Sequence, residues 1–143
     1  MGLNFNDYAR EGNEFMNKLA ADLGHSDRHD QVAILLRAVL HTLRDRISMQ
    51  ENLHIVSQLP MFLKGVYVDQ WSYSDEVDRL KTADEFARRV EEYQAQLGEQ
   101  RFDWNASTQE LITKELAAVE AYLTEGEITD VKSELPDEIA ALV

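Results

Sequence analysis

The amino-acid sequence predicts an all-α protein, a compact helical bundle made of two diverged tandem repeats. Three observations indicate this fold: apolar residues recur at helical spacing, four segments begin with a helix-capping pattern, and no stretch shows the alternation of a strand. Each repeat is predicted to contain a long helix, a short helix, a Leu-Pro kink and a further short helix. We expect one domain over residues 1–143, with the repeats at about 5–71 and about 82–143.

The repeat becomes visible when residues 76 positions apart are compared, because turn residues and apolar residues then match together. The matched pairs are Ser48 and Thr124, Glu51 and Glu127, Leu59 and Leu135, Pro60 and Pro136, Leu36 and Ile112, Leu40 and Leu116, Leu43 and Val119, and Ile47 and Leu123. Such a pattern indicates one supersecondary unit used twice.

The bounds of the first two helices are predicted mainly from the residues near their ends. The first is predicted over residues 5–23, with Asn6 or Asp7 as its cap and Gly24 in the left-handed position just after its end. The second is predicted from about residue 27 or 31 to residue 46. Its apolar positions recur at helical spacing, so one face of this helix is expected to point into the core. The residues on this face are Leu36, Leu40, Leu43 and Ile47.

The later helices begin with capping boxes, in which a Ser or Thr oxygen accepts the amide three residues on and a Glu carboxylate bonds back to the cap amide. The four boxes lie at 48–51, 82–85, 107–110 and 124–127. They open the predicted helices that follow each box, the last of which runs over about 125–134. Pro60 and Pro136 suit the first turn of the final helix in each repeat, because proline lacks the amide hydrogen.

The charge of the chain is strongly acidic and unevenly distributed. The 14 basic and 27 acidic residues give a net charge of 14 − 27 = −13, which argues against a nucleic-acid-binding protein because phosphates would be repelled. Residues 107–143 carry 2 − 9 = −7, whereas residues 26–67 carry 5 − 4 = +1. This asymmetry fits either attraction between the two halves or a partner-facing role for one of them.

Several features favour a cytoplasmic protein. No apolar run approaches the ~20 residues that span a bilayer. The N-terminal segment lacks the basic start and apolar block of a secretory signal. The chain has no cysteine, which excludes thiol chemistry and fits a reducing compartment. We therefore expect no membrane partner.

A basic stripe on the second helix is the first candidate for partner binding. Arg37, His41 and Arg44 fall at i, i+4 and i+7 and are assigned to the outer side of the helix. We expect them to dock an acidic element, either the second repeat or another protein. Asp45 lies beside His41, but no Ser or Cys nucleophile is spaced to complete an acid–base site, so no catalytic residue is predicted.

The second candidate follows Pro60. Tyr67 and Trp71 lie at i and i+4, and Lys64 precedes them on the same predicted face. Aromatic side chains beside a cation are typical of binding hot spots, but they also commonly staple a linker onto a domain. Both interpretations are open for this trio.

Metal and cofactor motifs are nearly absent. His25 and His29 lie four residues apart, but no third strong ligand is spaced for them, and the segment is typical of a solvated loop. Glu51 and His54 form the only Glu-x-x-His pair, whereas a carboxylate-bridged di-metal site needs two. No phosphate-binding or dinucleotide-binding glycine motif occurs. The sequence therefore predicts neither a cofactor nor a metal.

One run of the chain resembles a known family. The stretch VLHTLRDRIS is followed by QLPMFLKGVY and a Trp, and a second Leu-Pro comes near the end. The residues that carry the likeness are Leu59, Pro60, Leu63, Lys64, Gly65, Tyr67, Trp71, Leu135 and Pro136. The pattern resembles a bacterial family known as domain of unknown function 2267. The resemblance implies an all-helical fold and carries no catalytic or binding residues.

The sequence favours a non-enzymatic helical protein-interaction or regulatory module, because it contains well-capped helices without a convergent polar site. Two alternatives are open. One is a small-ligand-binding protein or enzyme with a pocket between the two repeats, into which polar groups such as His41 or His54 would point. The other is a structural homo-oligomer, with the aromatic residues around Trp71 buried against a second copy.

Overall fold

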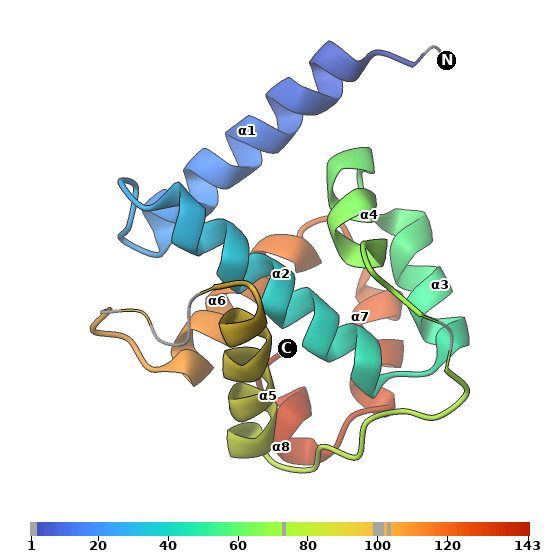
Figure 1. The fold of residues 1–143 in the computed structure, drawn as a ribbon. Helices are drawn as coiled ribbons and strands as arrows, with labels where there is room; N and C mark the ends of the chain where they lie inside the picture. The colour runs from blue at the N-terminus through green and yellow to red at the C-terminus, as the bar shows by residue number, and fades with distance from the viewer. Residues whose placement is uncertain (1–2, 73, 99–101, 103) are drawn as a thin grey trace.

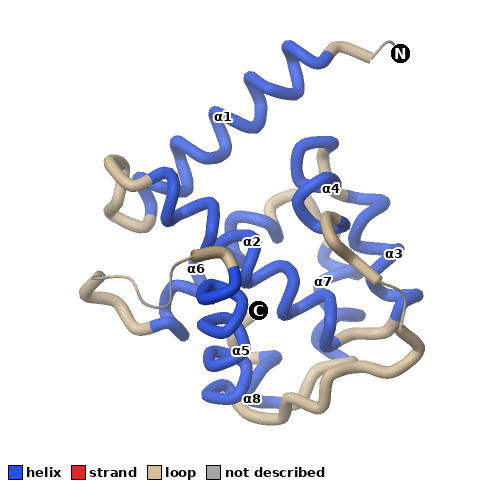
Figure 2. The backbone as a smooth tube through the Cα atoms, in the orientation of Figure 1, coloured by secondary structure: helices blue, strands red, loops and turns tan. Residues whose placement is uncertain are grey.

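The computed structural model describes residues 3–72, 74–98, 102 and 104–143, and within these ranges it contains eight helices and no strand. Their backbone is shown in Figures 1 and 2. The helices are α1 (Phe5–Asp22), α2 (His29–Arg46), α3 (Met49–Gln58), α4 (Met61–Val68), α5 (Ala83–Gln96), α6 (Thr108–Glu120), α7 (Glu125–Ser133) and α8 (Asp137–Ala140). The all-α prediction is confirmed. None of the described helices is both long and apolar enough to cross a membrane.

Helix α2 lies at the centre of the bundle, where it packs against α1, α4, α5 and α6 (Figure 1). It is therefore buried on more than one face, and its buried residues include polar ones. The four positions predicted to point inward, at residues 36, 40, 43 and 47, are all buried. The sequence pattern indicated a single apolar face, whereas the structure covers much of the helix surface.

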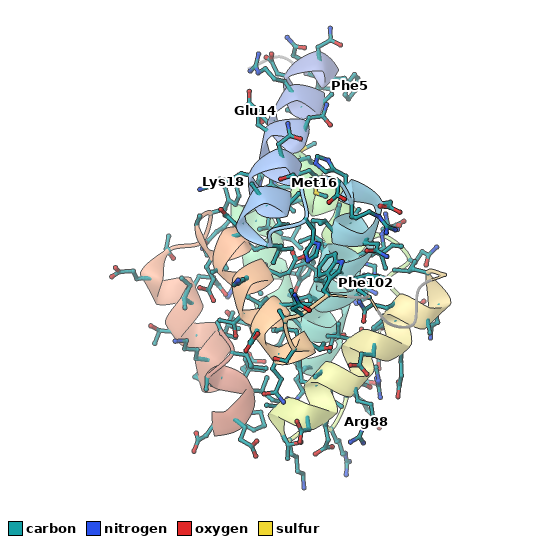
Figure 3. The ribbon with its side chains drawn as sticks, turned by 90° about the vertical axis from the view of Figure 1, so that its left-hand side faces the viewer. Phe5, Glu14, Met16, Lys18, Arg88 and Phe102 are labelled. Atoms are coloured by element: carbon teal, nitrogen blue, oxygen red, sulfur yellow. The ribbon has the colours of Figure 1, made fainter. Side chains whose placement is uncertain are left out.

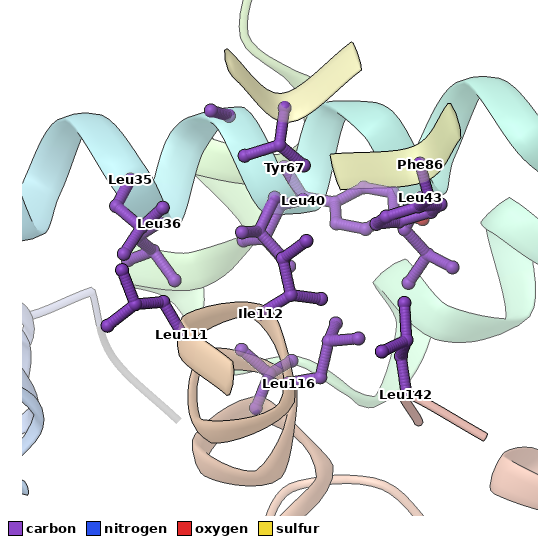
Figure 4. Close-up of a cluster of buried hydrophobic side chains, with 14 of the residues drawn as sticks. Leu35, Leu36, Leu40, Leu43, Tyr67, Phe86, Leu111, Ile112, Leu116 and Leu142 are labelled. Atoms are coloured by element: carbon purple, nitrogen blue, oxygen red, sulfur yellow. The ribbon is translucent and has the colours of Figure 1, made fainter. Parts of the chain in front are cut away.

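The apolar core joins side chains from both halves of the chain, as Figure 4 shows. Its labelled members are Leu35, Leu36, Leu40 and Leu43 from α2, Tyr67 from α4, Phe86 from α5, Leu111, Ile112 and Leu116 from α6, and Leu142. Full burial of one such apolar side chain stabilises the fold by roughly 1.5–3 kcal/mol. Contacts between α2 and α6 thus hold the two halves together.

The ends of helices α1, α2 and α5 follow the predicted chemistry only in part. Gly24 and Gly98 both adopt positive φ angles, of 77° and 103°, as expected just after a helix. The cap of α1 is Asn4, whose Oδ1 accepts the amides of Asn6 and Asp7, so the prediction of Asn6 or Asp7 as cap was wrong. Helix α2 begins without any side-chain cap.

Helix α1 projects from the rest of the molecule. Its second half is anchored by the buried residues Phe15, Leu19 and Ala20. Its first half stands away from the other helices, with Phe5 at the far end (Figures 1 and 3). The Phe5 residue is 73% exposed, which is unusual for a large apolar residue and leaves this end of the helix uncovered by the chain itself.

Candidate functional site

The predicted basic stripe on α2 contacts the end of α4. The His41 ring donates from Nε2 to the Val66 carbonyl oxygen at 2.8 Å. One Arg44 guanidinium nitrogen, Nη1, donates to the Tyr67 carbonyl at 2.8 Å and to the Asp69 carbonyl at 2.9 Å. These carbonyls lie at the C-terminus of α4, where helix geometry leaves them without intrahelical donors. The stripe therefore caps a neighbouring helix of the same chain.

Burial distinguishes the three members of the stripe. His41 and Arg44 are each only 4% exposed, so their assignment to the outer side of the helix was wrong. The reason is that α4 folds back across this side of α2. Arg37 is partly exposed and forms an ion pair with Asp69, which is an acidic partner within the chain. Burial lowers the pKa of His41, and the nearby guanidinium groups lower it further.

The aromatic pair predicted after Pro60 belongs largely to the interior. Tyr67 is fully buried, and its hydroxyl donates to Asn52 Oδ1. Burial raises the pKa of the Tyr67 phenol. The Trp71 ring packs edge-on against the Tyr67 ring at 6.3 Å, and the cation above Trp71 is Arg44, at 5.6 Å from the ring centroid. Of the predicted trio, Lys64 and Trp71 keep partial exposure.

An open groove lies between α1, the start of α4, and α6. Its volume is about 560 Å³, and its floor contains three aromatic rings. Phe15 lies 5.4 Å from Phe62 and 6.1 Å from Tyr122, and Phe62 lies 6.3 Å from Tyr122, all between ring centroids. The rim residues that carry charge are Glu11, Glu14, Lys18, Asp22 and Lys114. An apolar floor with a charged rim is typical of a surface that binds another helix.

The capping boxes at the starts of α3 and α7 differ from the prediction. Ser48 and Thr124 accept the amides three residues on, as expected. Their own amides, however, are bound by the opposite helix. The Ser48 amide donates to Glu134 Oε1 at 2.7 Å, and the Thr124 amide donates to Gln58 Oε1 at 2.9 Å. These contacts join the start of each helix to the end of the other, so α3 and α7 run antiparallel.

The box glutamates are consequently free for another role. Glu51 from α3 and Glu127 from α7 form a group with His54 in which one ligand atom from each residue lies within 4.8 Å of the others. The separation of His54 Nδ1 from Glu51 Oε2 is 3.9 Å. Both glutamates are buried, at 7% and 5% exposure. Glu51 Oε1 and Glu127 Oε2 are buried without a hydrogen-bond partner in the described structure.

Proximity and burial change the acidity of this pair. Burial and the adjacent Glu51 carboxyl, in that order of size, are the main causes that together raise the pKa of Glu127 to about 8. Asp130 and Glu134 add negative charge from the same helix. Two carboxylates in one buried site resist ionising together, because like charges repel strongly where water is excluded. The site therefore favours a proton or a cation between the two carboxylates.

Sequence reasoning missed this group because it assigned both glutamates to their local capping boxes. The signal that was available is their equivalence: Glu51 and Glu127 are 76 residues apart, as are their caps. The complete reciprocal box forms at Ser107. The other histidine pair makes no such group in the described ranges, and the His25 ring stacks on Trp104 at 4.0 Å between centroids.

Comparison with known proteins identifies the family of this chain. No curated protein matches the chain. A family whose members are described as "Uncharacterized conserved protein (DUF2267)" matches residues 12–142, nearly the whole sequence. This match confirms the resemblance seen in the Leu-Pro and Leu-Lys-Gly-aromatic segments. The chain belongs to the DUF2267 family.

Proposed function

We propose that this protein is a non-enzymatic helical protein-interaction or regulatory module of the bacterial cytoplasm, and that the groove between α1, α4 and α6 is its docking surface. The observation that carries the proposal is the cluster of Phe15, Phe62 and Tyr122 on the floor of this groove. Tyr122 is 40% exposed. An aromatic cluster that reaches the surface through one exposed ring favours a protein partner.

The proposed occupant is an amphipathic helix with basic residues beside its apolar face. The apolar face fits the aromatic floor, and the basic residues meet Glu11, Glu14 and Asp22 on the α1 side of the rim. The net charge of −13 also attracts a basic partner. A second copy of this chain is a poorer occupant, because it would bring another 13 negative charges to the interface.

We also propose that the two halves of the bundle are diverged copies of one unit. The contacts between α3 and α7 support this, because they are reciprocal. Ser48 and Thr124 are 76 residues apart, and so are Gln58 and Glu134, the residues that bind their amides. Equivalent positions thus make equivalent contacts across the junction of the two helices. The groove between α1, α4 and α6 is a different surface from the contact between α3 and α7.

Photo-crosslinking in the native host tests the groove. The crosslinking residue p-benzoylphenylalanine is placed at position 122, in the groove, or at position 88, at the other end of the molecule (Figure 3). Ala117→Arg fills the groove from an exposed position on α6. Thr113→Arg is the matched control, because it adds the same side chain to an exposed position of α6 that does not line the groove.

We expect an adduct at position 122 that Ala117→Arg removes and Thr113→Arg retains, with the crosslink mapped to a basic amphipathic helix. The absence of an adduct beyond that seen at position 88 would contradict the proposal. An adduct that persists in the Ala117→Arg protein would contradict it as well. Circular dichroism confirms that each variant is folded before the comparison is made.

A further inference from the structure

We propose that Glu51, His54 and Glu127 bind one divalent first-row transition cation. The inference goes beyond the interaction function and does not depend on it, because the site lies between α3 and α7 rather than in the groove. Glu51 and His54 lie at i and i+3 on α3, so they share one face of that helix. Glu127 approaches from α7 and supplies the third ligand.

The distances suit a single ion. Two ligand atoms that each lie about 2.1 Å from one ion are at most about 4.2 Å apart. The 3.9 Å separation of His54 Nδ1 from Glu51 Oε2 already meets this limit. All three ligand atoms lie within 4.8 Å of one another, so small side-chain rotations bring each of them within bonding distance of one ion.

Burial of unpaired carboxylate oxygens is the second and independent observation. Glu51 Oε1 and Glu127 Oε2 have almost no contact with solvent and accept no hydrogen bond within the described residues. A buried charge that is neither paired nor hydrogen-bonded is strongly unfavourable. A cation between the two carboxylates would remove this penalty, because their buried oxygens would then have a partner.

The surroundings hold the ligands in place. Bonds from Ser48 to Glu134 and from Thr124 to Gln58 fix the two ends of the α3–α7 pair, on either side of the ligand group. Both glutamates lie in the first turn of their helices, where the positive end of the helix dipole stabilises a carboxylate. The positions of the two helices that carry the ligands are therefore set by contacts that do not involve the cation.

The ligand types indicate which cation is preferred. One imidazole nitrogen with two carboxylate oxygens suits Zn²⁺, Mn²⁺, Fe²⁺ or Co²⁺ better than Mg²⁺ or Ca²⁺, which prefer oxygen ligands alone. The His54 side chain is 52% exposed, so the site opens to solvent on that side. This opening provides an entry path and room for water as a further ligand. A bound cation would also join α3 to α7 and so stabilise the contact between the two halves.

Equilibrium dialysis of the metal-free chain against Zn²⁺ tests the site. We expect one ion per chain, and we expect Glu51→Gln, His54→Gln and Glu127→Gln each to weaken binding at least tenfold. Glu125→Gln and His29→Gln are matched controls on exposed residues, and they should bind as the unmodified chain does. Mg²⁺ at the same concentration should not displace Zn²⁺.

Two further measurements keep the test decisive. Circular dichroism reports whether each variant is folded, and Glu127→Gln should fold readily because glutamine has nearly the same size and shape as glutamate. The His54 ring signals in NMR spectra should shift on addition of Zn²⁺, whereas those of His29 should not. Binding that is not saturable at one ion per chain would overturn the proposal. Zn²⁺ affinity within threefold of the unmodified chain in both His54→Gln and Glu127→Gln would overturn it too.

Discussion

Buried basic residues and buried acidic residues differ in their hydrogen-bond partners in this molecule. On α2, His41 and Arg44 are almost fully enclosed, yet each donates to carbonyl groups at the end of α4. Arg44 Nε has no hydrogen-bond partner in the described structure, but it lies 3.7 Å from the Asp45 carboxylate, so the charge of Arg44 is paired. On α3, α6 and α7, the carboxyl groups of Glu51, Glu115 and Glu127 are equally enclosed, yet each has at least one oxygen without a hydrogen-bond partner in the described structure.

This difference distinguishes polar groups that stabilise the fold from polar groups that can take up a proton or a cation. A buried donor that completes the hydrogen bonds of a helix end stabilises the fold. A buried carboxylate without a partner lowers the stability of the fold unless it takes up a proton or a cation. The basic residues of α2, which the sequence suggested as a binding stripe, therefore maintain the bundle, and the carboxylates are the groups that can respond to pH or ions.

The largest effect is expected from Arg44→Met, which tests the structural half of the comparison. The substitution keeps an apolar stem but leaves the Tyr67 and Asp69 carbonyls without their donor. Hydrogen bonds to a charged group contribute about 1.5–3 kcal/mol each, so we expect a loss of about 3 kcal/mol in the free energy of unfolding. Urea denaturation measures it.

Arg88→Met is the control for Arg44→Met, since Arg88 is exposed on α5. It should change the free energy of unfolding by no more than about 0.5 kcal/mol, as surface substitutions usually do. Equal effects of the two substitutions would show that Arg44 does not act through its buried hydrogen bonds.

Glu115→Met tests the acidic half and should act in the opposite direction. Glu115 is fully buried on α6, with neither carboxyl oxygen hydrogen-bonded in the described structure. Replacing an uncompensated buried polar group by an apolar one of similar size should raise the free energy of unfolding at pH 7 by about 1–3 kcal/mol. Urea denaturation at several pH values measures the gain.

The sign of the pH dependence for Glu115 follows from linkage. Burial raises the pKa of Glu115 well above its usual value of 4.5. The folded chain therefore holds a proton that the unfolded chain releases, and stability falls as the pH rises from about 4.5 toward the folded pKa. The advantage of Glu115→Met should be smallest below pH 4.5 and should grow at higher pH. A constant advantage would contradict this mechanism.

Glu127→Gln tests a carboxylate that lies next to another one. Because burial raises the pKa of Glu127 to about 8, the folded chain takes up a proton between about pH 4.5 and 8 and loses stability as the pH rises through this window. One proton gives a slope of at most about 1.4 kcal/mol per pH unit. The variant should show a flatter profile in metal-free buffer, whereas the exposed control Glu125→Gln should not.

Local sequence signals predicted the helices well because they depend on neighbouring residues. Apolar spacing, glycine after helix ends and Ser or Thr caps each act within a few positions. The boundaries of α3, α6 and α7 agree with these signals to within a few residues. The cap of α1 was misplaced because three polar residues close together in the sequence, at positions 4, 6 and 7, have similar capping chemistry.

The candidate sites were harder to predict because they depend on contacts between distant helices. His41 and Arg44 look solvent-facing on a helical projection, and only the return of α4 over α2 buries them. Glu51 and Glu127 look fully used by their capping boxes. Only the antiparallel approach of α3 and α7, in which Gln58 and Glu134 take over the cap amides, frees them.

The smallest effect is expected from Arg37→Gln, which sharpens the comparison within one helix. Arg37 lies on the same stripe as Arg44, but its side chain is 34% exposed and its Asp69 partner is 43% exposed. Solvent screens such a pair, so the free energy of unfolding should fall by no more than about 1 kcal/mol, and less at high salt. Urea denaturation at low and high salt measures this. If Arg37→Gln lowered the free energy of unfolding as much as Arg44→Met, then position on the stripe, rather than burial, would determine how much each residue contributes to stability.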